Sequence, residues 1–315
     1  MSFAATMLVA LAVDAATGWP DALFRRIGHP VTWLGGLIGA LDTRLNRPER
    51  SDAARGLAGA VTVALVVAAA ALPALAAQAA LPDGWAGVAL GGLLAWPLVA
   101  ARSLHAHVAA VASPLAQDDI DGARQAVAMI VGRDPSRLDD AGIARAALES
   151  LAENASDGVV APLFWGALLG LPGIAAYKAV NTLDSMIGHR TERHAAFGRV
   201  AARLDDAANW VPARLTGLAL ALASPRPRAA VRAMAQDARH HRSPNAGWPE
   251  AAMAGALGRR LSGPRVYADR VSPEPWLNGS APDPGPGDVA RGLALYLRAM
   301  ALVAALLAAL VLAGG

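Results

Sequence analysis

The apolar residues of this chain are gathered in long runs instead of recurring at helical or strand spacing. A bilayer core takes ~20 apolar residues per helix, and three runs reach or approach that length: Gly56–Leu81, Trp85–Ala101 and Gly292–Leu312. A shorter run, Ser2–Thr17, has neither the basic start nor the cleavage site of a signal peptide and predicts a retained first helix. The pattern therefore predicts a protein that crosses a membrane several times.

Composition supports this prediction. Hydrophobic residues make up 55% and charged residues 17% of the 315 positions, whereas soluble domains carry roughly 25% charged residues. The absence of cysteine excludes disulfides, zinc–thiolate sites and catalytic thiols. The net charge is +3, which in a membrane protein reports loop orientation. No nucleic-acid partner is expected.

The arginines indicate an orientation. Six lie between the first two candidate spans and five follow the third span up to residue 145, whereas the link at residues 82–84 has an aspartate and no arginine. The positive-inside rule places both arginine-rich stretches in the cytoplasm. We expect a multi-pass protein of the cell inner membrane with its polar excursions, residues 102–157 and 224–288, facing the cytoplasm.

The middle of the chain is less regular. Gly158–Ala176 is apolar but holds two prolines and four glycines, and a full crossing there would move the next arginines outside. We predict that it is broken or re-entrant, a form that often marks a ligand site. Val211–Ala223 is too short to cross alone.

No strand pattern is evident, and the polar region after the third span predicts helices over Asp118–Val131 and from Asp134. The predicted fold class is all-α, a polytopic integral membrane helical bundle with a broken or re-entrant helix and cytoplasmic helical segments, forming a single membrane domain over residues 1–315.

A first candidate cluster is acidic. Glu149 and Glu153 are four residues apart and share one helix face, with Asp157 one turn further on. Like charges at this spacing destabilise a helix, so they suggest a metal, an arginine or a cationic substrate group opposite them. The alternative is a solvated helix end at which Asn154 and Gly158 stop the helix.

A second cluster surrounds Lys178, the single lysine of the chain. Lys178, Asn181, Asp184 and Ser185 fall on one helical stripe, and the remaining positions are apolar. Such a stripe faces a cavity, and ionisable groups at membrane depth are candidates for function. The alternative is that they form polar contacts between helices.

A third cluster combines Asp205, Asp206 and Asn209. Carboxylates at this spacing suit Mg²⁺, which proteins hold with one or two carboxylates plus substrate phosphates. The alternative is a cytosolic helix start, where acidic residues are favoured by the helix dipole. Because the three clusters lie within ~70 residues beside apolar segments, we expect a single site.

A later loop adds Asn245 and Glu250 in a turn punctuated by Gly and Pro, which is typical of loops that bind ligands. The adjacent His240 and His241 are expected in a solvated loop. No Walker, nucleophile-elbow or Rossmann motif is present.

Five strings resemble the adenosylcobinamide-phosphate synthase family of cobalamin biosynthesis (CobD/CbiB). They are the Asp14–Gly35 segment, ESLAENASDGVVAPLFW from Glu149, AYKAVNTLDSMIGHR from Ala176, RLDDAANWVPARL from Arg203 and SPNAGWPEAAMAGAL from Ser243. They follow the family's order over most of the chain. One departure is His189, where an aromatic residue is expected.

The resemblance implies an ATP- and Mg²⁺-dependent ligase that joins adenosylcobyric acid, a cobalt corrinoid, to (R)-1-amino-2-propanol O-phosphate. In this interpretation Asp205, Asp206 and Asn209 hold Mg²⁺, Lys178 and Arg214 neutralise phosphoryl charge, and Glu149 or Glu153 is the general base. The other polar residues of the matching strings would bind substrate: Asn154, Ser156, Asp157, Asn181, Asp184, Ser185, His189, Arg190, Asn245 and Glu250.

Beyond substrates, the expected partners are membrane lipid, a second copy of the chain and other late cobalamin-pathway membrane enzymes. One rival interpretation is an AmpE-like membrane sensor without ligase chemistry. A sensor would tolerate the loss of Lys178 and the acidic pairs, whereas this sequence keeps all of them. A membrane prenyltransferase would need more spans than this sequence offers.

Overall fold

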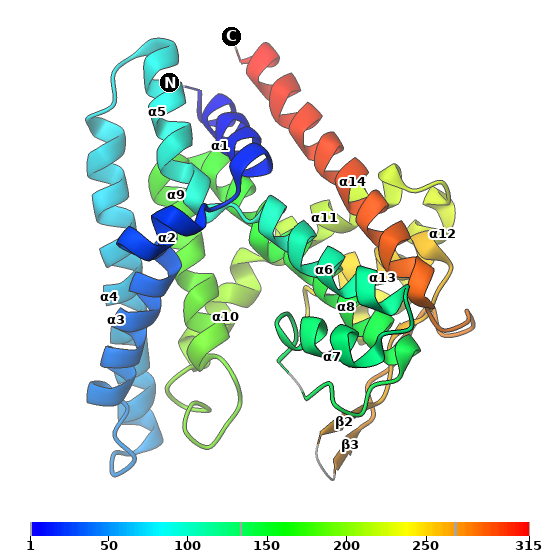
Figure 1. The fold of residues 1–315 in the computed structure, drawn as a ribbon. Coiled ribbons are helices and arrows are strands. Elements are labelled where there is room, and N and C mark those ends of the chain that lie inside the picture. Colours follow the sequence, from blue (N-terminus) through cyan, green and yellow to red (C-terminus); the bar gives the residue numbers. More distant parts are fainter. Residues whose placement is uncertain (1, 133, 268–269, 315) are drawn as a thin grey trace. The chain divides into compact units, whose positions relative to one another are not determined.

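The computed structural model describes residues 2–132, 134–267 and 270–314 and is 76% helical, which confirms the all-α class (Figure 1). Its α-helices are α1 Phe3–Thr17, α2 Asp21–Ile27, α3 Pro30–Leu45, α4 Asp52–Ala79, α5 Gly84–Ala95, α6 Ala101–Leu115, α7 Ile120–Ala128, α8 Asp140–Ala155, α9 Ala161–Ile187, α10 Arg199–Ala208, α11 Trp210–Ala223, α12 Pro227–Asp237, α13 Gly247–Leu257 and α14 Pro286–Ala313. Short helical turns are η1 Trp96–Leu98, η2 Ser156–Val160, which is a π-helix, and η3 Ala238–His240.

Within the described residues, four helical stretches are long and apolar enough to cross a membrane: Asp52–Ala80, Gly84–Leu115, Asp140–Ile187 and Pro286–Ala313. The pair Phe3–Thr17 and Asp21–Leu45, bent by 108°, makes a fifth if it is counted as one broken span. The predicted polytopic helical membrane fold is therefore confirmed. The α11 helix falls below this length, as expected.

Contacts along the chain divide it into two compact units. The first comprises Met1–Ala100, Ala161–Asn209 and Leu307–Gly315, and the second comprises Ala101–Val160 and Trp210–Leu306. Of the three predicted clusters, the Lys178 stripe and the Asp205 group belong to the first unit, and the acidic cluster belongs to the second.

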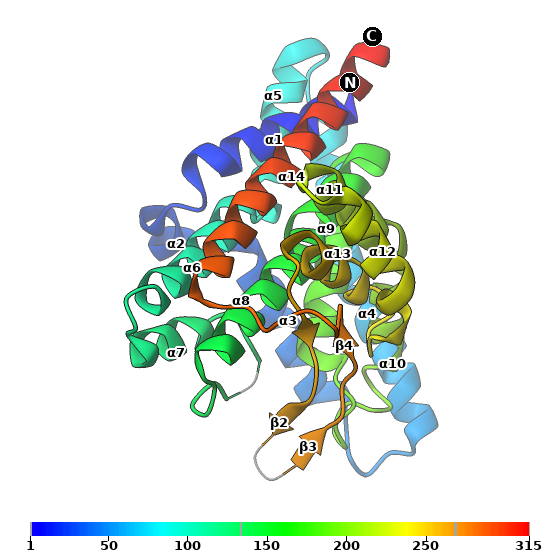
Figure 2. The ribbon, with the colours of Figure 1, turned by 90° about the vertical axis from the view of Figure 1, so that its right-hand side faces the viewer.

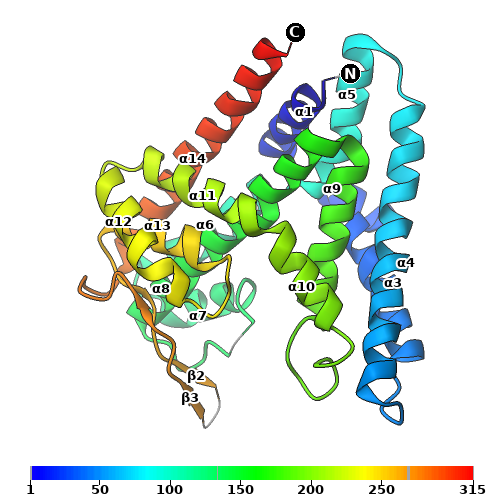
Figure 3. The ribbon, with the colours of Figure 1, turned by 180° about the vertical axis from the view of Figure 1, so that it is seen from behind.

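The first unit is built around α9. Helices α3 and α4 pack against it and against each other, and α10 packs on α9 and α4 (Figures 1 and 3). The approach of α4 to the loop before α10 is close, since a Cβ on Gly59 would lie 1.8 Å from the carbonyl oxygen of Phe197. The buried core of this layer is Ile38, Ala58, Val63, Val66, Ala179, Leu183, Ile187, Phe197 and Ala201.

Helix α9 is broken at Gly170, whose φ of 72° and ψ of −152° are non-helical. The amide of Leu171, freed by the break, donates to Oε1 of Gln78 on α4 over 2.8 Å. A Cβ on Gly170 would lie 2.0 Å from that same oxygen, so only glycine fits. The predicted break in Gly158–Ala176 is confirmed, and its position is set by this long-range contact.

The loop between α9 and α10 is fastened to the ends of α3 and α4. Arg193 forms an ion pair with Asp42 at 2.6 Å, and the Arg193 carbonyl accepts hydrogen bonds from Asn46 Nδ2 at 2.9 Å and Arg55 Nη2 at 2.5 Å. These contacts fix the ends of the two helices that carry the Lys178 and Asp205 clusters.

In the second unit α8 packs against α6 and α13, and α11, α12 and α13 pack on one another. The prediction that a helix starts at Asp134 is wrong, because α8 starts at Asp140. The cap is Asp139, whose Oδ1 accepts from the amide of Gly142 at 2.8 Å. Asp134 instead accepts from the amide of Ser136 at 2.9 Å in a local turn.

The acidic helix α8 does not end at Asn154 or Gly158. It passes through the π-helical turn η2 directly into α9. The alternative in which these residues stop a solvated helix end is therefore wrong, and the π turn lies within the cluster of predicted site residues, where such turns are frequent.

The described residues hold almost no strand, as the all-α class predicts. The short strands β1 Leu261–Ser262, β2 Arg265–Tyr267, β3 Arg270–Ser272 and β4 Trp276–Leu277 pair antiparallel as β1–β4 and β2–β3 (Figure 2). Strands of two or three residues are too short to show alternation in sequence. Asp283, which follows β4 in the chain, pairs with Arg260 just before β1 and with Arg145 of α8 at 3.1 Å.

Candidate functional site

A buried hydrogen-bond chain joins α9 to α10 in the first unit. The hydroxyl of Tyr177 donates to Oδ1 of Asn209 over 2.8 Å, and Nδ2 of Asn209 donates to Oδ2 of Asp205 over 3.0 Å. The other carboxylate oxygen, Oδ1 of Asp205, is buried and has no hydrogen-bond partner among the described residues. A buried acceptor left in this way is costly, which makes Asp205 a candidate to hold a cation or a proton.

The electrostatics of Asp205 agree with this. Burial, followed by the negative charge of Asp184, raises the pKa of Asp205 from 3.8 to about 7, while the amides of Asn209 and Asn181 act in the opposite direction. Burial disfavours the charged form of a carboxyl and a nearby like charge adds to that effect. Among the described residues, no positive charge acts to lower the pKa of this carboxyl.

The predicted stripe on α9 points toward the same region. Lys178, Asn181 and Asp184 are half-buried, and Lys178 Nζ donates to Oδ1 of Asn181 over 3.5 Å. Ser185 is exposed and donates to the Asn181 carbonyl. The structure thus brings Asn181 and Asp184 close enough to Asp205 to act on its charge.

Asp206 differs from its neighbour. It is exposed, because adjacent helical residues point about 100° apart. Partial burial raises the pKa of Asp206, and the charge of Arg190 opposes this shift. His189 and Arg190 are exposed in the loop that follows α9. Asp206 and Arg190 therefore form a rim to the buried Asp205.

The polar N-terminal loop reaches the same helix. His29 caps α3 through its side chain and packs edge-on against Trp19 at 5.0 Å, and Trp19 contacts Trp96 at 5.3 Å. The positive charge of Lys178 lies close enough to His29 to act on it. His29 is therefore the residue of this aromatic group that lies near the lysine.

The acidic cluster of the second unit is not uniform. Glu149 is buried, and its Oε1 accepts from the amide of Ser262 over 2.8 Å. Ser262 has a left-handed φ of 59°, so Glu149 stabilises an unusual backbone conformation in β1. Glu153 and Asn154 are exposed, Asp157 is half-buried and Ser156 is buried in the π turn.

Arg214 lies in a second polar group. Its guanidinium carbon is 4.1 Å from the ring centroid of Trp210 and 4.4 Å from that of Trp248. Nη1 of Arg214 donates to the Trp210 carbonyl at 2.6 Å and to Oδ1 of Asn245 at 3.4 Å. The two tryptophans were not predicted as site residues, since their contact depends on the packing of α11 against α13.

His241 is buried, which contradicts the expectation of a solvated loop for this residue, although His240 is exposed. Nε2 of His241 lies 3.6 Å from Oε2 of Glu250, and both side chains are almost fully buried. The sequence feature that indicates the burial of His241 is the pair of glycine- and proline-bounded turns around this residue, which bring α13 against η3.

The predicted residues therefore assemble into two groups. The first unit unites the Lys178 stripe with Asp205, Asn209 and Asp206, and the second unites Arg214 with Asn245 and places Glu250 of α13 beside His241. The roles assigned to them stay predictions.

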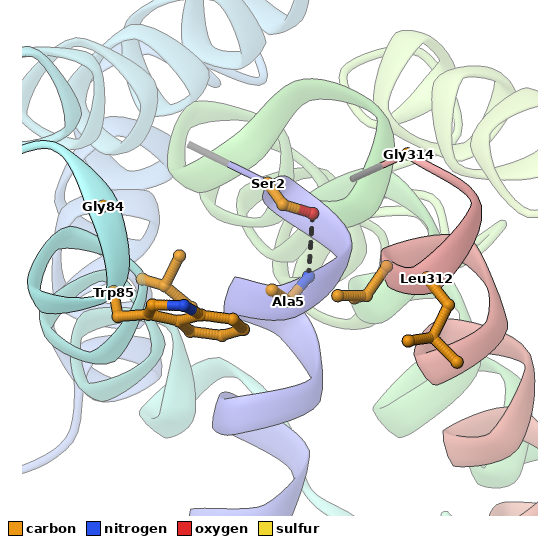
Figure 4. A pocket seen from close by; sticks show the side chains of 8 residues that line it. Ser2, Ala5, Gly84, Trp85, Leu312 and Gly314 are labelled. Carbon is orange, nitrogen blue, oxygen red and sulfur yellow. Dashed lines mark hydrogen bonds between the residues drawn. The ribbon is translucent and has the colours of Figure 1, made fainter.

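An apolar pocket of about 460 Å³ lies elsewhere in the first unit. It is lined by residues near the start of α1 and α5 and the end of α14, including Ala5, Trp85, Val88 and Leu312 (Figure 4). The hydroxyl of Ser2 at its edge accepts from the amide of Ala5 at 3.4 Å. No predicted site residue lines this pocket, so it is not the candidate site.

The fold and these groups define a helical membrane protein whose ionisable residues collect on a broken helix and the helices that follow it. The chain belongs to the CobD/CbiB family: it matches the family described as "CobD/Cbib protein" over residues 7–296. It is 66% identical over 301 residues to "Cobalamin biosynthesis protein CobD" of Rhodobacter capsulatus, covering 96% of this chain and 95% of the relative.

Relatives of the same name are more distant. The Brucella suis protein is 46% identical, covering 97% of this chain and 96% of the relative, and the protein of a Sinorhizobium species is 44% identical, covering 95% of each. No solved structure matches the chain. The predicted family is therefore confirmed, and with it membership in a family of cobalamin biosynthesis proteins.

Proposed function

We propose that this protein is an adenosylcobinamide-phosphate synthase. It would join a propionate carboxylate of adenosylcobyric acid to the amine of (R)-1-amino-2-propanol O-phosphate at the expense of ATP. The observation that carries the proposal is the match to the CobD/CbiB family across residues 7–296, which includes every residue of both polar groups.

The chemistry explains the need for ATP. A carboxylate is a poor electrophile, so transfer of the γ-phosphoryl group to it would give an acyl phosphate and ADP. The neutral amine would then attack the acyl carbon and displace inorganic phosphate, leaving the amide. Positive charge near the transferring phosphoryl group and a base near the ammonium are the groups that such a reaction requires.

The residues present fit a magnesium ion in part. Among the described residues no three His, Asp or Glu side chains are grouped to hold a metal, but Mg²⁺ needs only one or two carboxylates when substrate phosphates complete its shell. The buried, unpartnered Oδ1 of Asp205 is a suitable ligand atom. Asp206 faces outward, and both ends of the Asn209 amide already form hydrogen bonds.

We therefore assign Asp205 to Mg²⁺ and Asn209 to holding Asp205 in place, with Asp206 at the rim. When bound, the ion would offset charge on the ATP phosphates. Lys178 would neutralise phosphoryl charge from α9, while Asn181 and Asp184 would orient polar groups of the substrates. Glu153, which is exposed, is better placed than the buried Glu149 to accept a proton from the amine.

The cellular context is part of the same proposal. The arginine distribution supports an inner-membrane protein with its site toward the cytoplasm, where ATP is available. A second copy of the chain and other membrane enzymes of the late pathway are the protein partners we propose.

The test is a reconstitution. The protein is purified in nanodiscs and supplied with adenosylcobyric acid, aminopropanol phosphate and Mg-ATP, and the product is measured by mass. We expect an amide product that disappears when either substrate, ATP or Mg²⁺ is left out. Folded protein that neither makes the amide nor turns over ATP would overturn the proposal and favour a sensor that retains the family's fold.

A further inference from the structure

The guanidinium of Arg214 lies over the rings of two tryptophans. Trp210 lies one helical turn before it on α11, and Trp248 comes from the first turn of α13. The two helices approach closely at Gly217, where a Cβ would lie 3.1 Å from the Trp248 carbonyl. Two cation–π contacts restrict the rotation of the guanidinium.

One edge of the same group is also fixed. Nη1 donates to the Trp210 carbonyl and to Oδ1 of Asn245. A guanidinium has five N–H donors, and in the described part of the chain the donors on Nε and Nη2 of Arg214 have no partner. These two nitrogens form the fork that binds two oxygens of a carboxylate or phosphate side by side.

The charge around this fork is unbalanced. Among the described residues, no aspartate or glutamate forms an ion pair with Arg214, and the charge that acts on its guanidinium is that of another cation, Arg239. Partial burial, and then the charge of Arg239, lower the pKa of Arg214. Two cations without an acidic partner favour an anion with two negative charges over a single carboxylate.

Hydrogen bonds within the loop that carries Asn245 fix its conformation. Nδ1 of His241 accepts from the amide of Ser243 at 3.1 Å, and the Ser243 hydroxyl accepts from the amides of Asn245 and Ala246 at 3.3 and 3.2 Å. His241 itself is held by its buried contact with Glu250. Arg214 is thus oriented before any ligand arrives, which lowers the entropic cost of binding.

We propose that the Nε–Nη2 edge of Arg214, whose guanidinium contacts the rings of Trp210 and Trp248, binds the terminal phosphate of a phosphorylated small molecule. Two compounds of the proposed reaction offer such a group, the amino alcohol phosphate and ATP. The phosphate site stands on the contacts of Arg214 alone, and only the choice between these two compounds rests on the proposed function. Asn245, His241 and Glu250 are positioning residues for this site.

The test measures binding without catalysis. Full-length protein in nanodiscs of zwitterionic lipid is titrated separately with aminopropanol phosphate, with ATP and with the amino alcohol lacking phosphate, using isothermal titration calorimetry. Loss of a bidentate charged contact should weaken binding of one phosphate compound by about 10- to 100-fold in Arg214→Gln. Arg232→Gln, which changes an exposed arginine of α12 in the same unit, should bind like the wild type.

A second variant keeps the guanidinium. Asn245→Asp places a carboxylate beside Nη1 and should weaken the same compound at unchanged melting temperature, which covers the case in which Arg214→Gln folds poorly. A loss confined to the amino alcohol phosphate or to ATP identifies the ligand. Equal binding of both phosphate compounds by the wild type and both variants, or a loss that is as large for the amino alcohol lacking phosphate, overturns the site. Phosphate binding without amide synthesis would instead contradict only the proposed function.

Discussion

Asn209 donates a hydrogen bond from its side-chain amide to the carboxylate of Asp205, one helical turn earlier, over 3.0 Å. The same amide accepts from Tyr177 on another helix. Asp205 is therefore held by a contact that spans the chain connection between α9 and α10, while its second oxygen is left without a partner among the described residues. Asp205 thus combines a fixed carboxylate with an oxygen that is available to a cation or a proton.

Asp205→Asn should lower kcat/KM of amide synthesis by at least about 100-fold and leave the circular dichroism spectrum unchanged. The substituted amide can still accept from Asn209 but lacks the charge that a magnesium ion requires. Asp206→Asn, the matched change at the exposed neighbour, should have a much smaller effect. Full activity of the Asp205 variant would sink the metal assignment.

The raised pKa of Asp205 predicts how stability depends on pH. The folded protein retains a proton up to about pH 7 that the unfolded chain releases near 3.8, so the stabilisation is complete below the lower value and is lost as pH rises through the higher one. In the absence of divalent cations, the melting temperature of the wild type relative to Asp205→Asn should fall between about pH 4 and pH 7. A difference in melting temperature between the two proteins that stays constant with pH contradicts the raised pKa of Asp205.

The two glutamates of α8 can be separated. Glu149→Gln keeps an oxygen that can accept from the amide of Ser262, so most activity should remain. Glu153→Gln should lower kcat by roughly 100-fold or more if that exposed carboxylate removes the proton from the amine. Rate measurements on both variants at saturating substrate decide the matter. The reverse ranking would make Glu149 the base.

Gly170→Ala should destabilise the protein by roughly 1–3 kcal/mol, because a methyl group at this left-handed position would meet Oε1 of Gln78. Gly39→Ala is the control, since a Cβ there meets nothing within 4 Å on α3, and it should be neutral or stabilising. Thermal melts of both variants in one detergent provide the comparison. Equal melting temperatures would show that the break at Gly170 does not depend on the glycine.

Local patterns in the sequence accounted for the features that depend on neighbours along the chain. The uncharged run around α4 predicts a span because its length alone matches a bilayer. The spacing of Asp205 and Asn209 predicts their contact because one helical turn brings them together.

Features that depend on distant residues were not accessible in this way. The contact of Arg214 with the Trp248 ring comes from another helix, and the burial of His241 depends on how α13 packs against η3. The start of α8 was misplaced because Asp134 and Asp139 are both good caps, and the choice of Asp139 leaves Asp134 in a turn.

Lys178 gives the candidate site a distinctive chemical handle. It is the single lysine of the chain, half-buried beside Asn181, so a reagent that acylates lysine has a single side-chain target. Its labelling rate reports solvent access at this one position of α9, without mutation. A substrate that occupies the site would slow that rate, and mass spectrometry of a single peptide would follow it inside a native membrane.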